Sequence, residues 1–266
     1  MKQKTEIARS LAQQPEDVAL LTHLLDRADA CAQKCYVTAS RFLDLRQSTL
    51  AEQALRQYAA PQWFFHGGWE RAERRVIVFV PDYAQPEDIP GSEDDPIAVL
   101  RCVKHRADEL THRDYLGSLM GLQIRRDCVG DILVSDHGAD ILVLRELLPF
   151  LLTHYGKAGR KHLELSEVPL SDLILPEQSI EYLRDTVASM RLDAVTAALF
   201  RLSRTRAAEA VRRGAVYLDD RQCLNADCEV PEGARITLRG TGRGEVEQIL
   251  GESKKGRIIL SLKRYQ

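Results

Sequence analysis

The sequence lacks several features that would place it in familiar protein classes. It contains no run of about 18 consecutive apolar residues, the length that a membrane-spanning helix needs, so we expect no membrane partner. Residues 1–6 are mostly polar and do not resemble a signal region, so we expect a cytoplasmic protein. Its 6 cysteines form no CxxC pair, so we expect reduced thiols and no metal site. The spacing of Cys31 and Cys35 predicts that both lie on the inner face of one helix.

A complete catalytic motif is also missing. Residues 112–114 (HRD) match part of a kinase catalytic loop, but no glycine-rich loop or DFG motif follows the kinase order, and Thr111 with Asp114 predicts a helix cap instead. Residues 135–137 (SDH) are adjacent at a predicted turn, which prevents the geometry of a Ser-His-Asp triad. The glycines of residues 240–244 precede a predicted hairpin, whereas a dinucleotide-binding loop precedes a helix. We therefore expect no enzymatic activity and no cofactor.

The composition is that of an ordinary globular protein, but its charge is unevenly distributed. With 266 residues the chain exceeds the usual size of one compact domain, which favours two or three. Residues 186–266 contain 15 Lys and Arg against 10 Asp and Glu, whereas the rest of the chain contains 22 against 29. A basic module attached to an acidic body predicts a polyanionic partner for the module.

The pattern of apolar residues predicts an α+β fold. Residues 1–60 have helical periodicity, with Pro15 in the first turn of one helix and a second helix at 48–58. Alternation and turn signals then predict a β-α-β-β-α-β series, the ferredoxin-like order, with these limits: 97–104, 111–122, 131–135, 139–144, 146–155 and 162–168. The third strand lacks the aromatics that RNA-recognition domains stack on bases, so a base-stacking sheet is disfavoured. We expect four segments: an N-terminal helical region (1–60), a ferredoxin-like domain (61–168), a linker (169–185) and a final domain (186–266).

Two helices are predicted in the final domain, and the second carries unusual charges. Ser203 is placed to cap this second helix, and Gly214 suits the left-handed position after its end. Arg204 and Arg206 lie in its first turn, where the helix dipole disfavours cations. If no carboxylate of the chain neutralises them, they form an anion site suited to phosphate. Arg213 follows Arg206 by about two turns and emerges on nearly the same face.

These residues also carry a resemblance. The run from Ser189 to Asp220 resembles the S4 domain, an RNA-binding domain of ribosomal protein S4 and several other families. The matching elements are Leu192-Asp193, Leu199, Ser203-Arg204, Ala207, Gly214, Val216 and Asp219. The resemblance implies that the two helices and the strands after them grip structured RNA. With the basic residues of the predicted hairpin added, we expect RNA contacts from Arg191, Arg201, Ser203, Arg204, Thr205, Arg206, Arg212, Arg213, Arg243, Lys254, Lys255 and Arg257.

A narrower resemblance covers most of the chain. Residues 110–117 and 130–132, together with the order of helical start, α+β middle and S4 end, are similar to the YlmH family, although Gln123 stands where that family has glycine. This implies a monomer that binds 23S rRNA and peptidyl-tRNA on the large ribosomal subunit, in ribosome-associated quality control or rescue of stalled translation. Two alternatives stay open: an RNA-modifying enzyme with its active site in the central domain, and a protein–protein adaptor linked to cell division.

Overall fold

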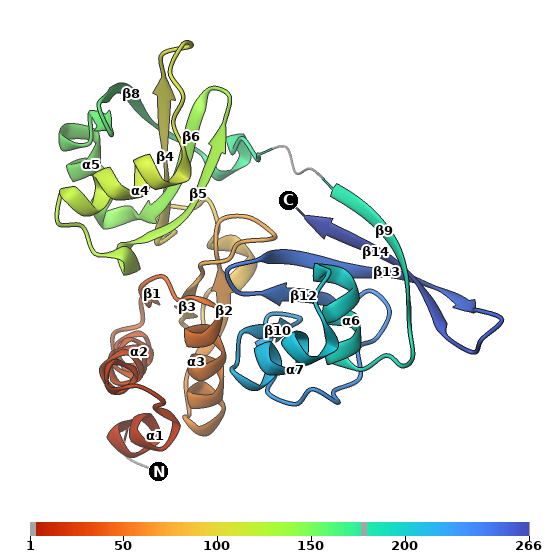
Figure 1. Ribbon diagram of the computed structural model, residues 1–266. Coiled ribbons are helices and arrows are strands. Elements are labelled where there is room, and N and C mark those ends of the chain that lie inside the picture. Colours follow the sequence, from red (N-terminus) through yellow and green to blue (C-terminus); the bar gives the residue numbers. More distant parts are fainter. Residues whose placement is uncertain (1–3, 177–179, 266) are drawn as a thin grey trace. The chain divides into compact units, whose positions relative to one another are not determined.

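The computed structural model describes residues 4–176 and 180–265, and the chain divides between Pro176 and Glu177 into two compact units (Figure 1). Helices and antiparallel sheets occur in both units, which confirms the α+β class. Within the described ranges, no helix is both long enough and apolar enough to cross a membrane.

The first unit begins with three helices, of which α2 is the longest. Pro15 begins α2, as predicted, and Asp17 accepts hydrogen bonds from the backbone N–H groups of Gln13 and Gln14 just before it. Cys31 is buried, but Cys35 is exposed because the helix ends there in a left-handed residue with φ 53°. The expectation that both cysteines face inward is therefore wrong for Cys35. The helices are α1 (Lys4–Leu11), α2 (Pro15–Lys34) and α3 (Leu45–Gln57).

A small three-stranded sheet packs on these helices, in the order β1-β3-β2. Its strands are β1 (Thr38–Ala39), β2 (Gln62–His66) and β3 (Val76–Val80). Every residue of β3 is buried, because Ile77 and Phe79 pack with the helices and Val78 packs in a second cluster on the other face. We expected residues 61–168 to form one domain, but β2 and β3 pair with β1 rather than with the central sheet.

The central sheet has the ferredoxin-like topology that the sequence predicts. Its order is β5-β6-β4-β8-β7 with antiparallel pairs, and α4 and α5 cover one face through Tyr115, Leu119 and Leu151 (Figure 1). The short strand β7 is an addition at the edge. The elements are β4 (Ile97–Lys104), α4 (His112–Gly121), β5 (Val129–Ser135), β6 (Gly138–Leu144), α5 (Leu148–His154), β7 (Lys157–Ala158) and β8 (Lys161–Val168), with 3-10 turns at Pro86–Asp88, Arg126–Cys128, Arg145–Leu147 and Leu170–Asp172.

The other face of the central sheet is covered by the N-terminal part of the same unit. Phe42 is fully buried with Leu142 and Leu144 of β6, and Val78 of β3 belongs to the same cluster. The contact is close at Gly130, where an added Cβ would lie 2.6 Å from a ring carbon of Phe42. RNA-recognition domains stack bases on the helix-free face of this type of sheet. Here side chains of the protein occupy much of that face.

Gln123, where the resemblance noted in the sequence implies glycine, follows α4 in a left-handed conformation. Its φ is 61°, a value that non-glycine residues adopt at a cost. The backbone N–H of Gln123 donates to the Met120 carbonyl and closes the end of the helix. Glycine would adopt this conformation without that cost.

The second unit is one six-stranded antiparallel sheet with two helices, in the order β11-β10-β12-β13-β14-β9. We expected 169–185 to be a linker, but β9 starts at Ile180 and pairs with β14 over its full length. The elements are β9 (Ile180–Val187), α6 (Leu192–Phe200), α7 (Arg204–Arg212), β10 (Val216–Leu218), β11 (Arg221–Gln222), β12 (Arg235–Leu238), β13 (Gly242–Glu252) and β14 (Ile258–Tyr265).

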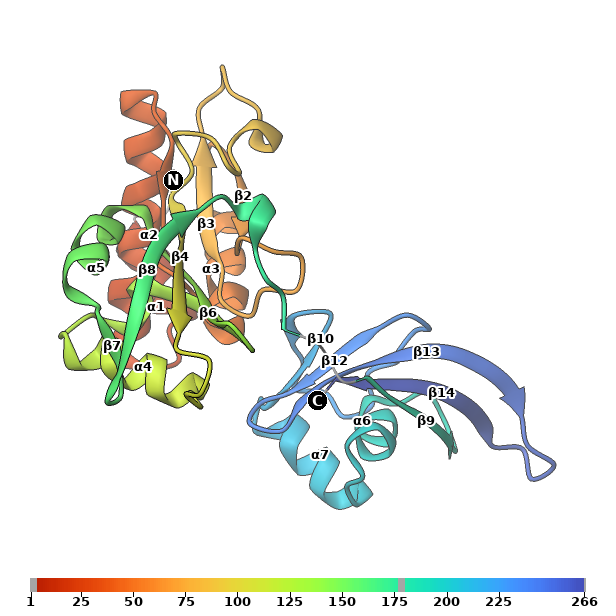
Figure 2. The ribbon, with the colours of Figure 1, turned by 90° about the horizontal axis from the view of Figure 1, so that it is seen from above.

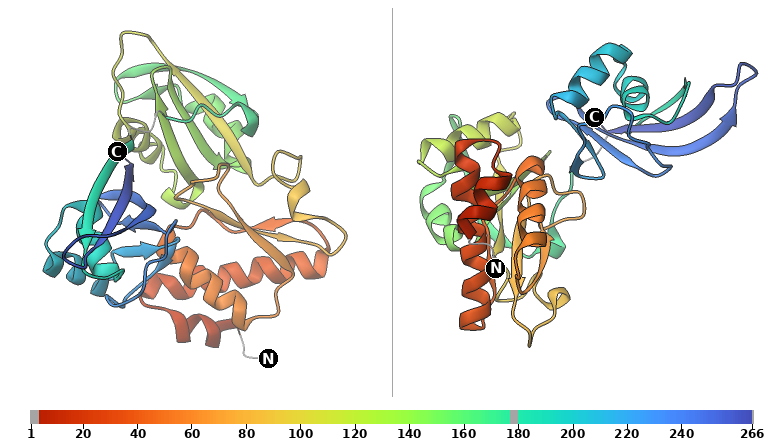
Figure 3. Two further views of the ribbon diagram at one scale, coloured as in Figure 1. Left: turned by 90° about the vertical axis from the view of Figure 1, so that its right-hand side faces the viewer. Right: turned by 90° about the horizontal axis from the view of Figure 1, so that it is seen from below.

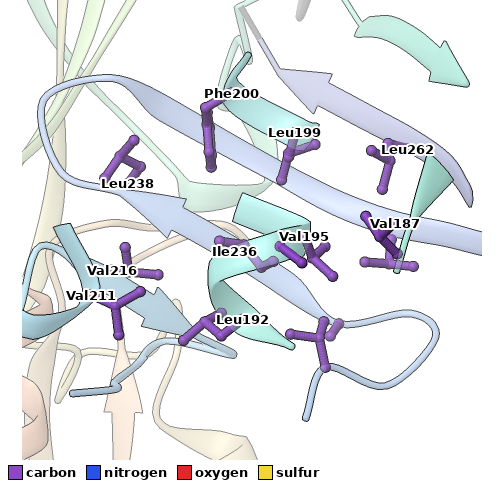
Figure 4. Close-up of a cluster of buried hydrophobic side chains, with 14 of the residues drawn as sticks. Val187, Leu192, Val195, Leu199, Phe200, Val211, Val216, Ile236, Leu238 and Leu262 are labelled. Atoms are coloured by element: carbon purple, nitrogen blue, oxygen red, sulfur yellow. The ribbon is translucent and has the colours of Figure 1, made fainter. Parts of the chain in front are cut away.

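The core of this unit lies between the helices and the sheet (Figure 4). Val195 and Leu199 of α6 and Val211 of α7 are fully buried against Ile236 and Leu262 of the strands. Strand β13, with 11 residues, is the longest described strand of this sheet, and the tip of its hairpin with β14 extends away from the two helices (Figures 2 and 3). The helices therefore cover one part of the sheet and leave the hairpin tip exposed.

Candidate nucleic-acid interface

Helix α7 has one buried side and one basic side. The Ser203 hydroxyl accepts a hydrogen bond from the Arg206 backbone N–H at 3.2 Å, which confirms the predicted cap. Gly214 has φ +70° just after the helix end, as expected for a left-handed terminus. The buried side of the helix turns small apolar residues toward the sheet, among them Ala207 and Val211. The arginines of α7 therefore emerge on its solvent side.

Three of these arginines have no counterion within the described part of the chain. The side chains of Arg206, Arg212 and Arg213 are exposed and make no hydrogen bond or ion pair to any described residue. Arg239, which the sequence analysis did not single out, is also exposed and lies beside the end of α7. Its backbone N–H donates to the Ala215 carbonyl at 2.9 Å. We call Arg206, Arg212, Arg213 and Arg239 the α7 surface.

Arg204, by contrast, already has an internal partner. Its guanidinium donates to the carboxylate of Asp193 at 2.9 Å, and Arg191 pairs with the same carboxylate at 3.2 Å. Burial raises the pKa of Asp193, but the hydrogen bonds from Arg191 and Arg204 outweigh it, so this pKa lies below its ordinary value. The premise that no internal carboxylate neutralises the first-turn arginines is therefore wrong for Arg204. It applies to Arg206.

Arg204 and Arg191 nevertheless keep part of their surface in solvent. Their side chains are 49 % and 42 % exposed, whereas that of Asp193 is 7 % exposed. Each guanidinium carries five N–H donors, so a contact with Asp193 does not use them all. Asp193 orients both groups at the edge of the α7 surface. If Arg204 contacts RNA, its guanidinium group therefore contacts both a phosphate and the Asp193 carboxylate.

Apart from Ser203 and Thr205, which are exposed at the start of α7, the remaining expected RNA-binding residues do not join this surface. Arg201 pairs with Glu181 at 2.6 Å, and Arg257 donates to the hydroxyl and carbonyl oxygens of Thr186, so both hold β9 in place. Arg243 is partly buried in β13. Thr205 is exposed on α7, whereas Lys254 and Lys255 are exposed at the hairpin tip, away from the helices (Figure 2).

The sequence could not have placed Arg239 next to α7. That placement depends on the register of β10 with β12, in which Val216 lies opposite Leu238. Only the glycines after Arg239 hinted at a turn there. Register is set by long-range pairing and by the buried face of each strand, and not by the residues of one segment.

The motifs that resemble catalytic sites have structural roles. The N–H and hydroxyl of Thr111 donate to the Asp114 carboxylate at 2.8 and 2.6 Å, which confirms the predicted cap of α4. Residues 135–138 form the turn between β5 and β6. Within the residues that the structure covers, no group of three or more metal-ligating side chains is found.

The fold defines an α+β protein with N-terminal helices, a central ferredoxin-like domain and a C-terminal domain in which two helices pack on an antiparallel sheet, the part of the chain that resembles the S4 domain in sequence. The chain belongs to the YlmH family. It is 31% identical over 223 residues to "Ribosome-associated protein quality control protein P2" of Bacillus subtilis (strain 168), which covers 84% of this chain and 85% of that protein. Residues 96–172 match the family described as "Putative RNA-binding domain in YlmH". "Cell division protein ylmH from Streptococcus pneumoniae", a solved structure, is similar with a TM-score of 0.49 and 25% identity over 61% of this chain and 98% of that one.

Proposed function

We propose that this protein binds structured RNA of the large ribosomal subunit, 23S rRNA and peptidyl-tRNA, through its C-terminal S4-type domain. It acts without catalysis, in ribosome-associated quality control or the rescue of stalled translation. The name of the Bacillus subtilis relative supports a place on the ribosome. Residues 96–172 match a family described as a putative RNA-binding domain, which supports RNA as a ligand of this chain and concerns its central domain.

The observation that carries the proposal is the set of unpaired arginines on α7. Three exposed guanidinium groups, those of Arg206 and Arg212 on α7 and of Arg213 at its end, have no carboxylate partner in the described chain. The three positive charges repel one another, and an anion that approaches them lowers their electrostatic free energy. Guanidinium binds phosphate through paired N–H donors, and an RNA backbone offers phosphates at regular spacing.

A neutralised α7 surface tests the proposal directly. The triple variant R206Q/R212Q/R213Q of the full chain should bind purified large-subunit ribosomal RNA roughly tenfold more weakly or worse. Each phosphate contact contributes about 0.7 to 0.9 to the slope of log affinity against log salt, so that slope should become shallower by about 2 to 3. Fluorescence anisotropy over a salt series measures both quantities.

The hairpin tip of the same unit supplies a matched comparison. Lys254 and Lys255 are also exposed cations, but they lie away from α7, so K254Q/K255Q should weaken binding less than the α7 variant does. An α7 variant with wild-type affinity and salt slope would refute the proposal. A larger loss of affinity in the hairpin variant than in the α7 variant would mean that the RNA interface lies at the hairpin tip.

A further inference from the structure

A second cluster of cations lies at one end of the central sheet, in the first unit. This unit does not contain the S4-type domain. We call it the basic end and define it by six residues: Lys104, Arg106, Arg113, Lys157, Arg160 and Lys161. They come from the segment between β4 and α4 and from the hairpin of β7 and β8. Figure 2 shows both segments at the same end of the sheet, beside α4.

Two contacts hold these segments together, and a third pair of residues lies close by. Lys161 of β8 pairs with Asp108 of the β4–α4 segment at 2.6 Å. The backbone N–H of Gly159, at the hairpin turn, donates to the Ser118 hydroxyl of α4 at 2.7 Å. Gly159 also lies against Asp114, since an added Cβ would be 3.7 Å from that carboxylate. The neighbours of these residues in the chain, Arg106, Arg113 and Arg160, are therefore gathered on one surface.

The basic end is locally cationic although its unit is acidic. Residues 104–114 and 157–162 contain six Lys or Arg against three Asp or Glu, whereas residues 1–176 contain 21 against 26. Two of the three carboxylates are engaged, because Asp108 pairs with Lys161 and Asp114 caps α4. The side chains of Arg106, Arg113, Lys157 and Arg160 are exposed and make no hydrogen bond or ion pair to a described residue.

Among the described residues, the helix-free face of the central sheet offers no comparable surface for a polyanion. The helix-free face of the sheet is packed against Phe42 and Val78, and where it stays open it presents Val103 and Glu164. Arg101, on the same face, is committed to Asp140 at 2.8 Å. Bases therefore have no exposed aromatic platform on this face, and a negative partner is directed to the end of the sheet.

We propose that the basic end is a second RNA-binding surface that contacts phosphates of the backbone without reading sequence. The inference rests on the proposed RNA-binding function. It also deepens the match of residues 96–172 to a family described as a putative RNA-binding domain, because it names the part of the central domain that contacts RNA. Three features favour RNA over an acidic protein partner. Most of the cations are unpaired, they extend over two segments as a polyanion requires, and apolar side chains for a protein contact are scarce among them.

Neutralisation of the basic end tests the inference on the full chain. The variant R106Q/R113Q/R160Q should bind large-subunit ribosomal RNA several-fold more weakly and with a salt slope shallower by about 2. The matched control is R9Q/R27Q/K34Q, which removes three exposed cations from α1 and α2 of the same unit. This control should keep wild-type affinity, although its net charge changes by the same amount.

The outcomes separate this inference from the proposed function. If the basic-end variant and its control bind RNA equally well, the second surface does not exist, whatever the α7 variant does. If only the basic-end variant loses affinity for RNA, this inference is supported and the function proposed for the α7 surface is refuted. If the basic-end variant binds RNA normally but loses intact ribosomal subunits, the partner is a ribosomal protein and the inference is overturned.

Discussion

At the scale of single residues, Asp193 is the side chain that holds two arginines in place beside the α7 surface. It is buried near the start of α6 and pairs with Arg191 and Arg204, which it holds at the edge of that surface. A buried carboxylate is costly unless cations and hydrogen bonds compensate it. Asp193 therefore links the stability of the second unit to the orientation of two candidate RNA-binding arginines.

The substitution Asp193→Asn should lower the free energy of unfolding by about 1 kcal/mol at pH 7, because solvent screens the half-exposed guanidinium groups. The folded pKa of Asp193 lies below its ordinary value, so the stabilisation is complete above the unfolded pKa and disappears as pH falls through the folded pKa. The difference between wild type and variant in urea unfolding should thus shrink from pH 7 to pH 3.

The exposed partner of Arg191 gives the control for this prediction. Asp227 also pairs with Arg191, but its side chain is 63% exposed, so Asp227→Asn should leave stability almost unchanged. A loss at Asp193 that is the same at pH 7 and pH 3 would mean that shape, and not charge, explains the effect.

The features that the sequence predicts best are those of single residues and their immediate neighbours. The cap at Ser203 and the left-handed position at Gly214 follow from the chemistry of each residue and its immediate neighbours. The pairing of Asp193 with Arg204 was missed, because it joins two helices and depends on how they pack. Segment-local patterns contain no information on such a contact.

At the scale of elements, alternation and helical periodicity predicted the central β-α-β-β-α-β order, and the sheet order confirms it. Strand β9 was missed because it lies at a sheet edge, where Ile180 and Tyr182 are exposed and the apolar pattern is weak. The covering of the central sheet by Phe42 was missed for another reason. It joins segments that are far apart in the chain.

The packing of α6 on β13 gives a prediction about elements. Gly244 of β13 lies under α6, and an added Cβ would be 2.6 Å from both a Leu199 methyl group and the Lys263 carbonyl oxygen. Gly244→Ala should therefore destabilise the second unit by about 1–3 kcal/mol. Gly117 of α4 has nothing within 4 Å of an added Cβ, so Gly117→Ala should stabilise the first unit by about 0.5–1 kcal/mol.

The two units can be followed separately in this comparison. Both tryptophans, Trp63 and Trp69, lie in the first unit, so their fluorescence reports its unfolding, while circular dichroism reports both units. The same substitution is expected to act in opposite directions at the two glycines. If both substitutions raise stability, or both lower it, the space around each glycine does not determine the change in the free energy of unfolding.

At the scale of the whole molecule, the net charge of −2 does not explain attraction to RNA. Attraction would come from two local surfaces, the α7 surface and the basic end, which belong to different units of one chain. When one surface binds a long RNA, the other is held near the same RNA at a high effective concentration. Two weak sets of phosphate contacts then give a tight complex without base-specific contacts.

This arrangement predicts that the length of the RNA determines which substitutions matter. On a short hairpin that one surface covers, R206Q/R212Q/R213Q should reduce affinity and R106Q/R113Q/R160Q should have little effect. On large-subunit ribosomal RNA both variants should lose affinity, and their combination should lose roughly a hundredfold or more, because avidity requires both surfaces. Equal losses on the short and the long RNA would contradict tandem binding, since they would mean that the two surfaces grip a single site. Anisotropy titrations of the four proteins on both RNAs, at one salt concentration, distinguish these outcomes.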